Sequence, residues 1–232
     1  MMVNAALQTK LEAGLAEMGL QIPAEKQSKL IAYLLLICKW NKVHNLTAVR
    51  DPLEMVTLHL LDSLSVLPYI QELDAKRLLD VGAGAGLPSI PLAICLPELQ
   101  VTAIDAVQKK ASFMRQAKGE LGLNNFHVES GRVEALKKEP LSNEPRFDVI
   151  ISRAFSEITL FIQLTKHLLA EDGYWLAMKG MQPQLELANL ESMKLDVQVE
   201  KIIPLHVAGL QAERRLVFLQ PRNFTPGILE NN

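Results

Sequence analysis

Glycines alternate with alanines in the segment Gly82–Leu87, directly between two apolar runs. Asp80 stands two residues before the first glycine, and no lysine or arginine occurs from Leu78 to Gln108. Glycine permits positive φ angles and lets a ligand lie against bare backbone. A strand, a glycine-rich turn and a helix start form a common ligand position in open α/β sheets. A tight turn without a ligand is the alternative, but three alternating glycines exceed what such a turn requires.

The spacing of Gly82, Gly84 and Gly86 distinguishes among possible ligands. The dinucleotide fingerprint is Gly-x-Gly-x-x-Gly, and Leu87 occupies the place of its third glycine. A P-loop is excluded because no Gly-Lys-Ser/Thr follows. A pyrophosphate would meet the Asp80 carboxylate, with only a helix N-terminus in its favour. S-adenosylmethionine carries a cationic sulfonium and ammonium and no phosphate, so the acidic loop favours this cofactor.

A second acidic residue, Asp105, ends the apolar run 100–105, nineteen residues after Gly86. A carboxylate at this place can accept hydrogen bonds from both hydroxyls of a ribose. A strand-end aspartate can instead cap the helix that follows. The spacing from the glycine loop favours the ribose. The two features together predict a nucleoside-type cofactor, S-adenosylmethionine.

The residues after the fourth apolar run indicate which acceptor is methylated. Amino-group methyltransferases usually carry an Asn/Asp-Pro-Pro-aromatic motif there, and this chain has Ser152 and Arg153. Cytosine C5 methylation requires a cysteine nucleophile, whereas Cys38 and Cys95 both lie in apolar helical segments and are expected to be buried thiols.

Guanine N7 has a free lone pair and needs no general base, only a donor-rich pocket. Arg153 and Lys179 each follow or end a predicted strand, where substrate or cofactor would lie. A solvated cation or a surface ion pair is the alternative for each. Their shared location at strand ends favours a functional role.

The pattern of the chain from Lys76 onward predicts an α/β fold. Short apolar runs alternate with two long helical segments; the runs are 77–82, 100–106, 125–130, 147–152 and 173–180, and the helical segments are 109–122 and 157–173. Continuous apolar strands separated by helices indicate a parallel sheet covered on both faces. The runs 199–207 and 213–221 predict an antiparallel hairpin at one sheet edge.

The first seventy residues are helical in pattern. The segment 29–47 has the apolar density of a core-facing helix that ends near Asn45. Asp51, Pro52 and Glu54 form a helix start, with an N-cap, a first-turn proline and a capping glutamate. We therefore expect three parts: a helical N-terminal cap at 1–72, a Rossmann-like methyltransferase domain at 73–222 and a tail at 223–232.

Composition narrows the class of protein further. The chain has 232 residues, is 49% hydrophobic and 22% charged, and can bury a sizeable core. Its longest apolar run, 30–38, is too short to span a bilayer, and its start lacks a secretion signal. Two cysteines suggest neither a disulfide framework nor a metal site. These features predict a cytoplasmic protein without a metal or a membrane. The net charge of −2 means that any nucleic acid must bind through a local patch.

Seven segments together resemble one bacterial family, RsmG, formerly glucose-inhibited division protein B. In chain order they are KWNKVHNLTAVRDPLEM, HLLDSL, LLDVGAGAGLPSIPLA, SGRVEAL, ISRAF, MKG and ERRLVFL. The likeness runs from about Leu30 to Leu219. The resemblance implies a class I methyltransferase fold behind a helical cap. It also implies methyl transfer from S-adenosylmethionine to guanine N7 in the decoding region of 16S ribosomal RNA.

The resemblance also implies roles for individual positions. Cofactor contacts are implied for Gly82, Leu87, Val133, Glu134 and Arg153. The place where the guanine enters is implied to be surrounded by Asn45, His59, Asp62, Arg153 and Lys179. With the residues argued above, the expected cofactor set is Gly82, Gly84, Gly86, Leu87, Asp105, Val133, Glu134 and Arg153. Arg153, Lys179 and Asn45 are expected to position the substrate.

His59, Asp62 and Ser63 fall at i, i+3 and i+4 on one helix, so they could act together or simply fix helix packing. The partner implied is 16S ribosomal RNA within the small ribosomal subunit, with no obligate protein partner. Candidate RNA-facing cations are Lys39, Lys42, Arg50, Arg214, Arg215 and Arg222. Two other functions stay open at this point: methylation of a small molecule or protein, and a non-catalytic module for ribosome assembly.

Overall fold

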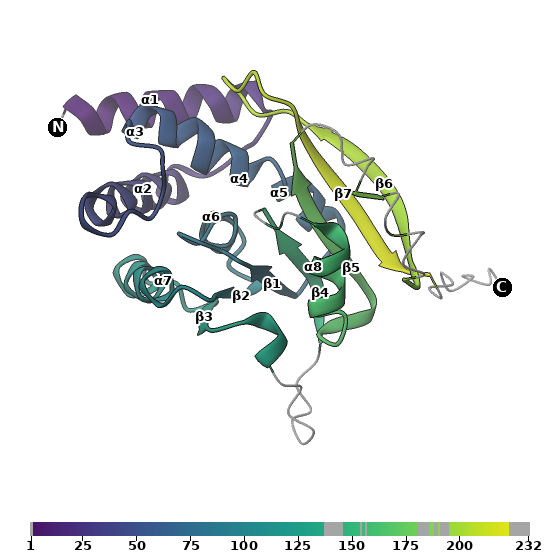
Figure 1. Ribbon diagram of the computed structural model, residues 1–232. Helices are drawn as coiled ribbons and strands as arrows, with labels where there is room; N and C mark the ends of the chain where they lie inside the picture. Colours follow the sequence, from purple (N-terminus) through teal and green to yellow (C-terminus); the bar gives the residue numbers. More distant parts are fainter. Residues whose placement is uncertain are drawn as a thin grey trace.

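The computed structural model describes residues 2–136, 146–153, 155, 157–180, 186–187, 190 and 195–222. Seven strands form one sheet in the order β3-β2-β1-β4-β5-β7-β6 (Figure 1). The strands are β1 (Arg77–Val81), β2 (Gln100–Asp105), β3 (Phe126–Ser130), β4 (Phe147–Ser152), β5 (Leu169–Lys179), β6 (Val197–Leu205) and β7 (Arg214–Pro221). Strands β1 to β5 are parallel, and β7 runs antiparallel to both β5 and β6. The predicted parallel sheet with a C-terminal antiparallel hairpin is confirmed.

The strand order reverses at β1, which pairs with β2 on one side and with β4 on the other. Leu79, for example, lies opposite Thr102 of β2 and Ile150 of β4. Such a reversal opens a crevice beyond the carboxyl ends of the strands, where open α/β sheets bind ligands. The glycine loop leaves β1 at this point.

Helices cover both faces of the sheet (Figure 1). They are α1 (Met2–Glu17), α2 (Ala24–His44), α3 (Pro52–Met55), α4 (Asp62–Leu64), α5 (Leu67–Glu72), α6 (Ser89–Cys95), α7 (Gln108–Leu121) and α8 (Ile158–Thr165). Helix α2 contacts α6 and α7 on one face, and α8 contacts β5 on the other. Successive strand residues alternate between the two faces: Leu78 joins the core beneath α2, and Leu79 joins the core beneath α8.

The N-terminal helices share one hydrophobic core with the sheet. Leu11 of α1 and Tyr33 of α2 belong to the same buried cluster as Leu78 of β1 and Phe113 of α7. Burial of apolar surface contributes on the order of 25 cal/mol per Å², so these helices contribute directly to the stability of the sheet layer.

The two cysteines, both expected to be buried, differ in exposure. Cys95 is buried, but Cys38 is only half-buried, and its sulfur lies 3.5 Å from the Met55 sulfur.

The helical stretch 52–72 starts as the sequence predicts and then departs from a regular α-helix. The Asp51 carboxylate accepts a hydrogen bond of 3.1 Å from the Leu53 N–H, which caps α3. Residues Val56–Leu61 then form a π-helical segment, η1, before α4 begins. The stretch Pro52–Glu72 is long and apolar enough to cross a membrane, but 72% of an 18-residue part of it, with a mean hydropathy of 1.2, is buried inside the protein. This burial accounts for its apolar character.

The predicted helix over 157–173 is wrong in its second half, because α8 ends at Thr165 and β5 begins at Leu169. The Thr165 hydroxyl donates to the Phe161 carbonyl at 2.7 Å and accepts from the Trp175 indole at 2.9 Å. These two hydrogen bonds hold the turn between α8 and β5. Leu169 then pairs with Phe147 of β4, so the strand is longer than its apolar part.

Candidate active site

The glycine loop between β1 and α6 has a backbone that favours glycine at three positions. Gly82, Gly84 and Gly86 have φ angles of +70°, +62° and +86°. A Cβ on Gly82 would meet nothing within 4 Å, and one on Gly84 would meet only a backbone oxygen at 4.0 Å. A Cβ on Gly86 would lie 2.5 Å from the Ile90 side chain. Gly82 and Gly84 therefore border open space, whereas Gly86 allows the loop to pack on α6.

Asp105 at the end of β2 holds the glycine loop and also bonds to the residue that precedes α7. One carboxylate oxygen accepts from the Gly84 N–H at 2.8 Å, and the other accepts from the Val107 N–H at 2.8 Å. Lys110 lies 3.8 Å from the same carboxylate. Each carboxylate oxygen has a second acceptor position. The side chain can therefore bind the glycine loop, the backbone before α7 and a ligand hydroxyl together.

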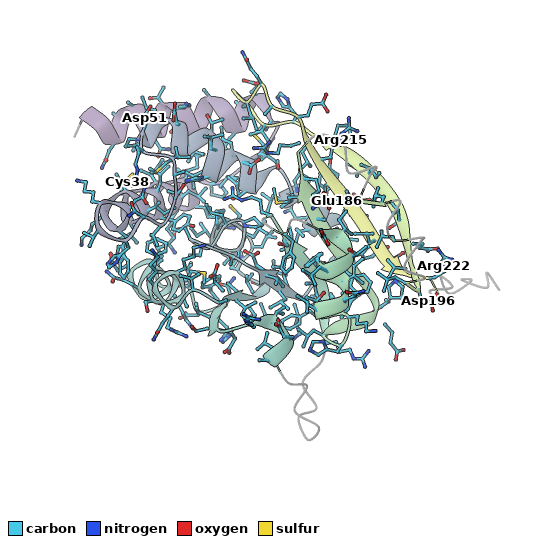
Figure 2. All side chains as sticks on the ribbon, in the orientation of Figure 1. Cys38, Asp51, Glu186, Asp196, Arg215 and Arg222 are labelled. Atoms are coloured by element: carbon cyan, nitrogen blue, oxygen red, sulfur yellow. The ribbon has the colours of Figure 1, made fainter. Side chains whose placement is uncertain are left out.

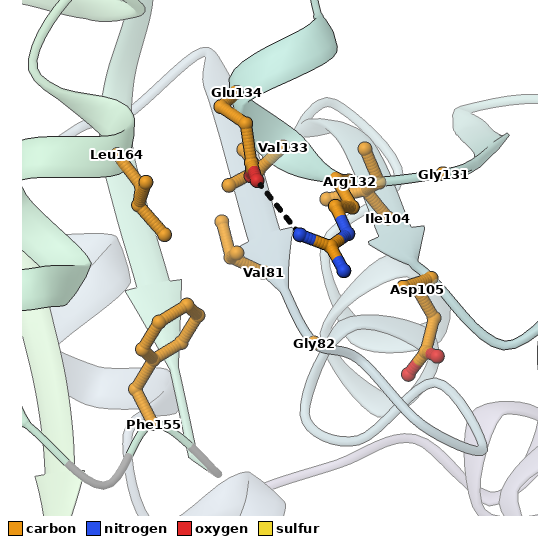
Figure 3. A pocket seen from close by; sticks show the side chains of 11 residues that line it. Val81, Gly82, Ile104, Asp105, Gly131, Arg132, Val133, Glu134, Phe155 and Leu164 are labelled. Atoms are coloured by element: carbon orange, nitrogen blue, oxygen red, sulfur yellow. Dashed lines mark ion pairs between the residues drawn. The ribbon is translucent and has the colours of Figure 1, made fainter.

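A pocket of about 310 Å³ opens beside the loop (Figure 3). Its apolar walls are Val81, Ile104, Val133, Phe155 and Leu164, and its polar side chains are Asp105, Arg132 and Glu134. Arg132 and Glu134 form an ion pair of 3.8 Å across part of the opening. An apolar slot for a flat ring, with a carboxylate at one end, is what an adenosine group requires.

The wholly buried Asp80 lies directly before the loop. One of its oxygens accepts from the Ser89 N–H at 3.2 Å, and the other, Oδ1, has no hydrogen-bond partner among the described residues. Burial raises the pKa of this carboxyl to about 6. A buried acceptor oxygen without a partner is costly, and beside this loop it fits a cofactor with a cationic ammonium and sulfonium.

A second pocket, of about 300 Å³, lies at the carboxyl ends of β4 and β5. It is lined by Leu58, Asp62, Arg153, Met178, Lys179, Gly180 and Arg214. In its lining the buried Asp62 carboxylate accepts from Arg153 at 3.1 Å and from Arg214 at 2.9 Å. Arg153 also donates to the Leu58 carbonyl at 3.1 Å. We call Asp62, Arg153 and Arg214 the arginine–aspartate cluster.

The π-helical segment η1 contributes to this cluster. A π-helix bonds i to i+5, and such segments often occur at functional sites. Leu58, whose carbonyl accepts from Arg153, lies in the middle of η1. The segment therefore presents a backbone acceptor and, one residue past its end, the Asp62 carboxylate to the same guanidinium.

The Lys179 side chain already has hydrogen-bond partners within the protein. Its ammonium donates to the Phe155 carbonyl at 2.8 Å and to Glu186, labelled in Figure 2, at 2.6 Å. The same Glu186 oxygen accepts from the Ile158 N–H at the start of α8, at 3.2 Å. Lys179 lines the second pocket, and these bonds tie the segment after β4 to α8.

The other residues predicted to surround the guanine lie around a loop in the cap. Asn45 ends α2 in the left-handed conformation, accepts from Arg50 at 2.8 Å and lines neither pocket. His59 is buried, its Nε2 lies 3.0 Å from the Thr47 hydroxyl, and burial lowers its pKa. Asp62 binds the arginines instead, so His59 and Asp62 have different partners.

The remaining predicted cofactor residues divide between the pocket and its supports. Gly82, Asp105, Val133 and Glu134 line the first pocket. Gly84 and Gly86 shape the loop, and Leu87 is buried behind it. Arg153 lines the second pocket. In the sheet register Asp80 lies opposite Ile151, so Arg153 leaves β4 beside the point where Gly82 leaves β1.

Phe155, Asn41 and Arg214 are among the contributors that sequence reasoning missed. Phe155 forms an apolar wall of the first pocket, and an aromatic residue two positions after Arg153 was the available signal. Asn41 is buried and shapes the cap loop, donating to the Val49 carbonyl at 3.1 Å and accepting from the Thr47 N–H at 3.0 Å. Arg214 was expected to face RNA, but its pairing with Asp62 had no local signal.

The strand order, the glycine loop and the strand-end carboxylate together define a class I methyltransferase. Solved structures share the fold. An O-methyltransferase from Bacillus cereus in complex with SAH matches with a TM-score of 0.60, at 16% identity, over 92% of this chain and 98% of that one. The O-methyltransferase TomG from Streptomyces achromogenes matches with a TM-score of 0.61, at 13% identity, over 90% and 96%.

Sequence relatives identify the family. The GidB family, described as rRNA small subunit methyltransferase G, matches residues 26–218. Ribosomal RNA small subunit methyltransferase G of Methylobacillus flagellatus is 62% identical over 94% of this chain and 100% of its own length. The protein of the same name from Neisseria gonorrhoeae is 50% identical over 92% and 98%. The chain belongs to the rRNA small subunit methyltransferase G family.

Replacing Gly84 by valine should abolish cofactor binding while the protein still unfolds cooperatively, because the new side chain would project into the space beside the loop. Gly122 ends α7 at a φ of +65° with nothing within 4 Å of an added Cβ. Gly122→Val therefore imposes similar backbone strain away from the pocket. Calorimetric titration with S-adenosylmethionine should show loss of binding in the Gly84 variant alone. Unchanged affinity in that variant would refute the loop as the cofactor site.

Asp80→Asn should raise thermal stability and weaken cofactor binding at pH 8. The pKa of Asp80 is raised to about 6 in the folded protein, so its ionisation costs stability as pH rises from about 4 through 6. Asparagine keeps the acceptor for Ser89 without the charge. The variant should melt a few degrees above wild type at pH 8, with the gap closing toward pH 4.

Wild-type affinity for the cationic cofactor should fall as pH drops through about 6, because protonation removes the Asp80 charge. The variant's affinity should be weaker and independent of pH over that range. Titrations at pH 5, 6, 7 and 8 measure both. A wild-type affinity that does not change with pH would show that the charge of Asp80 does not contribute to cofactor binding.

Proposed function

We propose that the protein transfers a methyl group from S-adenosylmethionine to N7 of a guanine in the decoding region of 16S ribosomal RNA. The observation that carries the proposal is the arginine–aspartate cluster, placed beside a nucleoside pocket by the register of β1 and β4. One pocket suits the adenosine of the cofactor. The other offers guanidinium donors at the place where an acceptor base would lie. Membership of the family and the names of its close relatives support the same activity.

The cofactor pocket would bind adenosine through residues whose positions are fixed in the fold. Val81, Ile104, Val133 and Phe155 would enclose the adenine ring. Asp105 would accept from the ribose, and Gly82 and Gly84 would lie against the methionine portion. Bound S-adenosylmethionine supplies an electrophilic methyl group on its sulfonium.

The acceptor pocket has the chemistry that guanine N7 needs. N7 carries a lone pair and no proton, so the protein needs to orient the base and need not deprotonate it. Asp62 is held by two guanidiniums and is thereby unavailable as a base. Arginine donors can recognise the guanine O6 acceptor, which adenine replaces with an amino donor. The cluster therefore favours guanine over adenine.

The cluster also suits the charge that methylation creates. Guanine becomes cationic when N7 is methylated, and two arginines alone would oppose that charge. The Asp62 carboxylate neutralises one of the two guanidiniums. The cluster keeps its hydrogen-bond donors while its net charge is reduced to +1.

In this proposal, the two main parts expected from the sequence have different roles. The helical cap, 1–72, would supply Asp62 and a surface for RNA, and the Rossmann-like part, 73–222, would supply the cofactor site; the expected tail, 223–232, lies outside the described residues. Exposed cations Lys39, Lys42 and Arg50 lie on the cap. Because the chain as a whole carries a net charge of −2, recognition would rest on RNA shape and the ribosomal particle as well as on charge. Such a substrate places the enzyme in the cytoplasm.

The test is transfer of labelled methyl groups to small ribosomal subunits from cells that lack this protein, with deproteinised 16S RNA as a parallel acceptor. The expected product is one new strand-scission site diagnostic of an N7-methylated guanine. Incorporation without scission would reject N7. Absence of incorporation into either RNA acceptor would favour a small-molecule or protein substrate, or a non-catalytic role.

Arg153→Ala should lower methyl transfer far more than stability. The substitution leaves the buried Asp62 with Arg214 alone, so a moderate loss of stability is also expected. Adding Asp62→Asn replaces the half-paired buried carboxylate by an amide whose oxygen can still accept from Arg214, which is 28% exposed and can be hydrated. The double variant should regain part of the melting temperature while methyl transfer stays reduced by at least tenfold.

The single variant Asp62→Asn controls for loss of the carboxylate and should retain more activity than the double variant. Melting curves and initial rates on small subunits give both quantities. Recovery of activity together with stability in the double variant would make Arg153 a structural residue only.

A further inference from the structure

The glycine loop receives a hydrogen bond from the N-terminal helices. The Tyr33 hydroxyl of α2 donates to the Ala85 carbonyl at 2.6 Å and lies 3.3 Å from the Gly86 carbonyl. Tyr33 is 0% exposed. Near the N-terminus of the same helix, Lys26 donates to the Cys95 carbonyl at the end of α6, at 2.7 Å. Helix α2 thus bonds to the glycine loop that precedes α6 and also to Cys95, the last residue of α6.

Two anchors from separate parts of the chain hold adjacent loop residues. Asp105 of β2 binds the Gly84 N–H, and Tyr33 of α2 binds the carbonyl of Ala85, the next residue. Glycine has more conformational freedom to lose on folding than any other residue. A loop with three glycines at positive φ therefore depends on outside contacts for its shape, and these two bonds act from different elements.

The surroundings of Tyr33 suit a fixed donor. Its ring lies 6.3 Å from the Phe113 ring of α7, which in turn contacts Trp40 at 5.5 Å. Burial raises the pKa of the hydroxyl well above its ordinary value. The group therefore stays protonated, and its position is set by aromatic packing that does not involve the hydroxyl.

We infer that Tyr33 is a positioning residue for the cofactor: its hydroxyl holds the glycine loop in the shape that binds the ligand, which makes the N-terminal cap part of the cofactor site. The inference deepens the proposed function and rests on its cofactor assignment. Tyr33 acts through the Ala85 carbonyl and does not line the pocket. Its effect should therefore appear in cofactor affinity and not in recognition of RNA.

The test is Tyr33→Phe, which keeps the ring and removes the hydroxyl. The matched control is Tyr69→Phe, since Tyr69 lies in α5 and its ring contacts Phe218 at 6.0 Å. Titration with S-adenosylmethionine should show affinity reduced about five- to tenfold in the Tyr33 variant and unchanged in the control. In steady state, KM for the cofactor should rise while KM for the small subunit stays the same.

Hydrogen exchange supplies a second readout. Backbone amides of the loop, 82–90, should exchange faster in the Tyr33 variant, with α7 and β5 unchanged. A lower melting temperature with cofactor affinity within twofold of wild type would overturn the inference and leave Tyr33 a packing residue. Failure of the wild type itself to bind cofactor would overturn the proposed function and this inference together. Wild-type binding without RNA methylation would reject only the acceptor.

Discussion

A buried carboxylate must have partners, and Asp62 determines how three distant parts of the chain meet. An ionised carboxylate loses several kcal/mol of hydration when it leaves water, and charged hydrogen bonds must compensate for that loss. Asp62 obtains them from Arg153 at the end of β4 and from Arg214 at the start of β7. The helical cap, the parallel sheet and the C-terminal hairpin are therefore joined at one point. That point borders the second pocket, so the requirement for charge pairing also shapes the candidate site.

The glycine loop shows a similar dependence between parts. The glycines allow its backbone conformation, but Asp105 of β2 and Tyr33 of α2 hold it from separate parts of the chain. The hydrophobic cluster that contains Tyr33 runs without a break from α1 to the sheet. The cap is therefore structurally continuous with the methyltransferase fold, even though the sequence pattern changes sharply at Lys76.

Local patterns predicted the elements well, and long-range contacts were beyond them. The apolar runs identified all seven strands, and the Asp51 cap and the end of α2 at Asn45 followed from residue type. The π-helical segment and the start of β5 at Leu169 could not be predicted from the sequence, because contacts with distant parts of the chain decide both. The pairing of Asp62 with Arg214 spans 152 positions and leaves no periodic signal. Several residues that the family motifs singled out line one of the two pockets, whereas the hydrogen-bond partners of Lys179 and Asn45 required the structure.

The position of β7 has a consequence for synthesis of the chain. Strand β7 is the last described strand, yet it lies between β5 and β6 inside the sheet. The residues that line the first pocket all precede residue 165, but Arg214 of the second pocket emerges from the ribosome about fifty residues later. Domains generally fold as units. Because β7 pairs with β5 inside the sheet and supplies Arg214, neither the sheet nor the second pocket can be completed before β7 has been made.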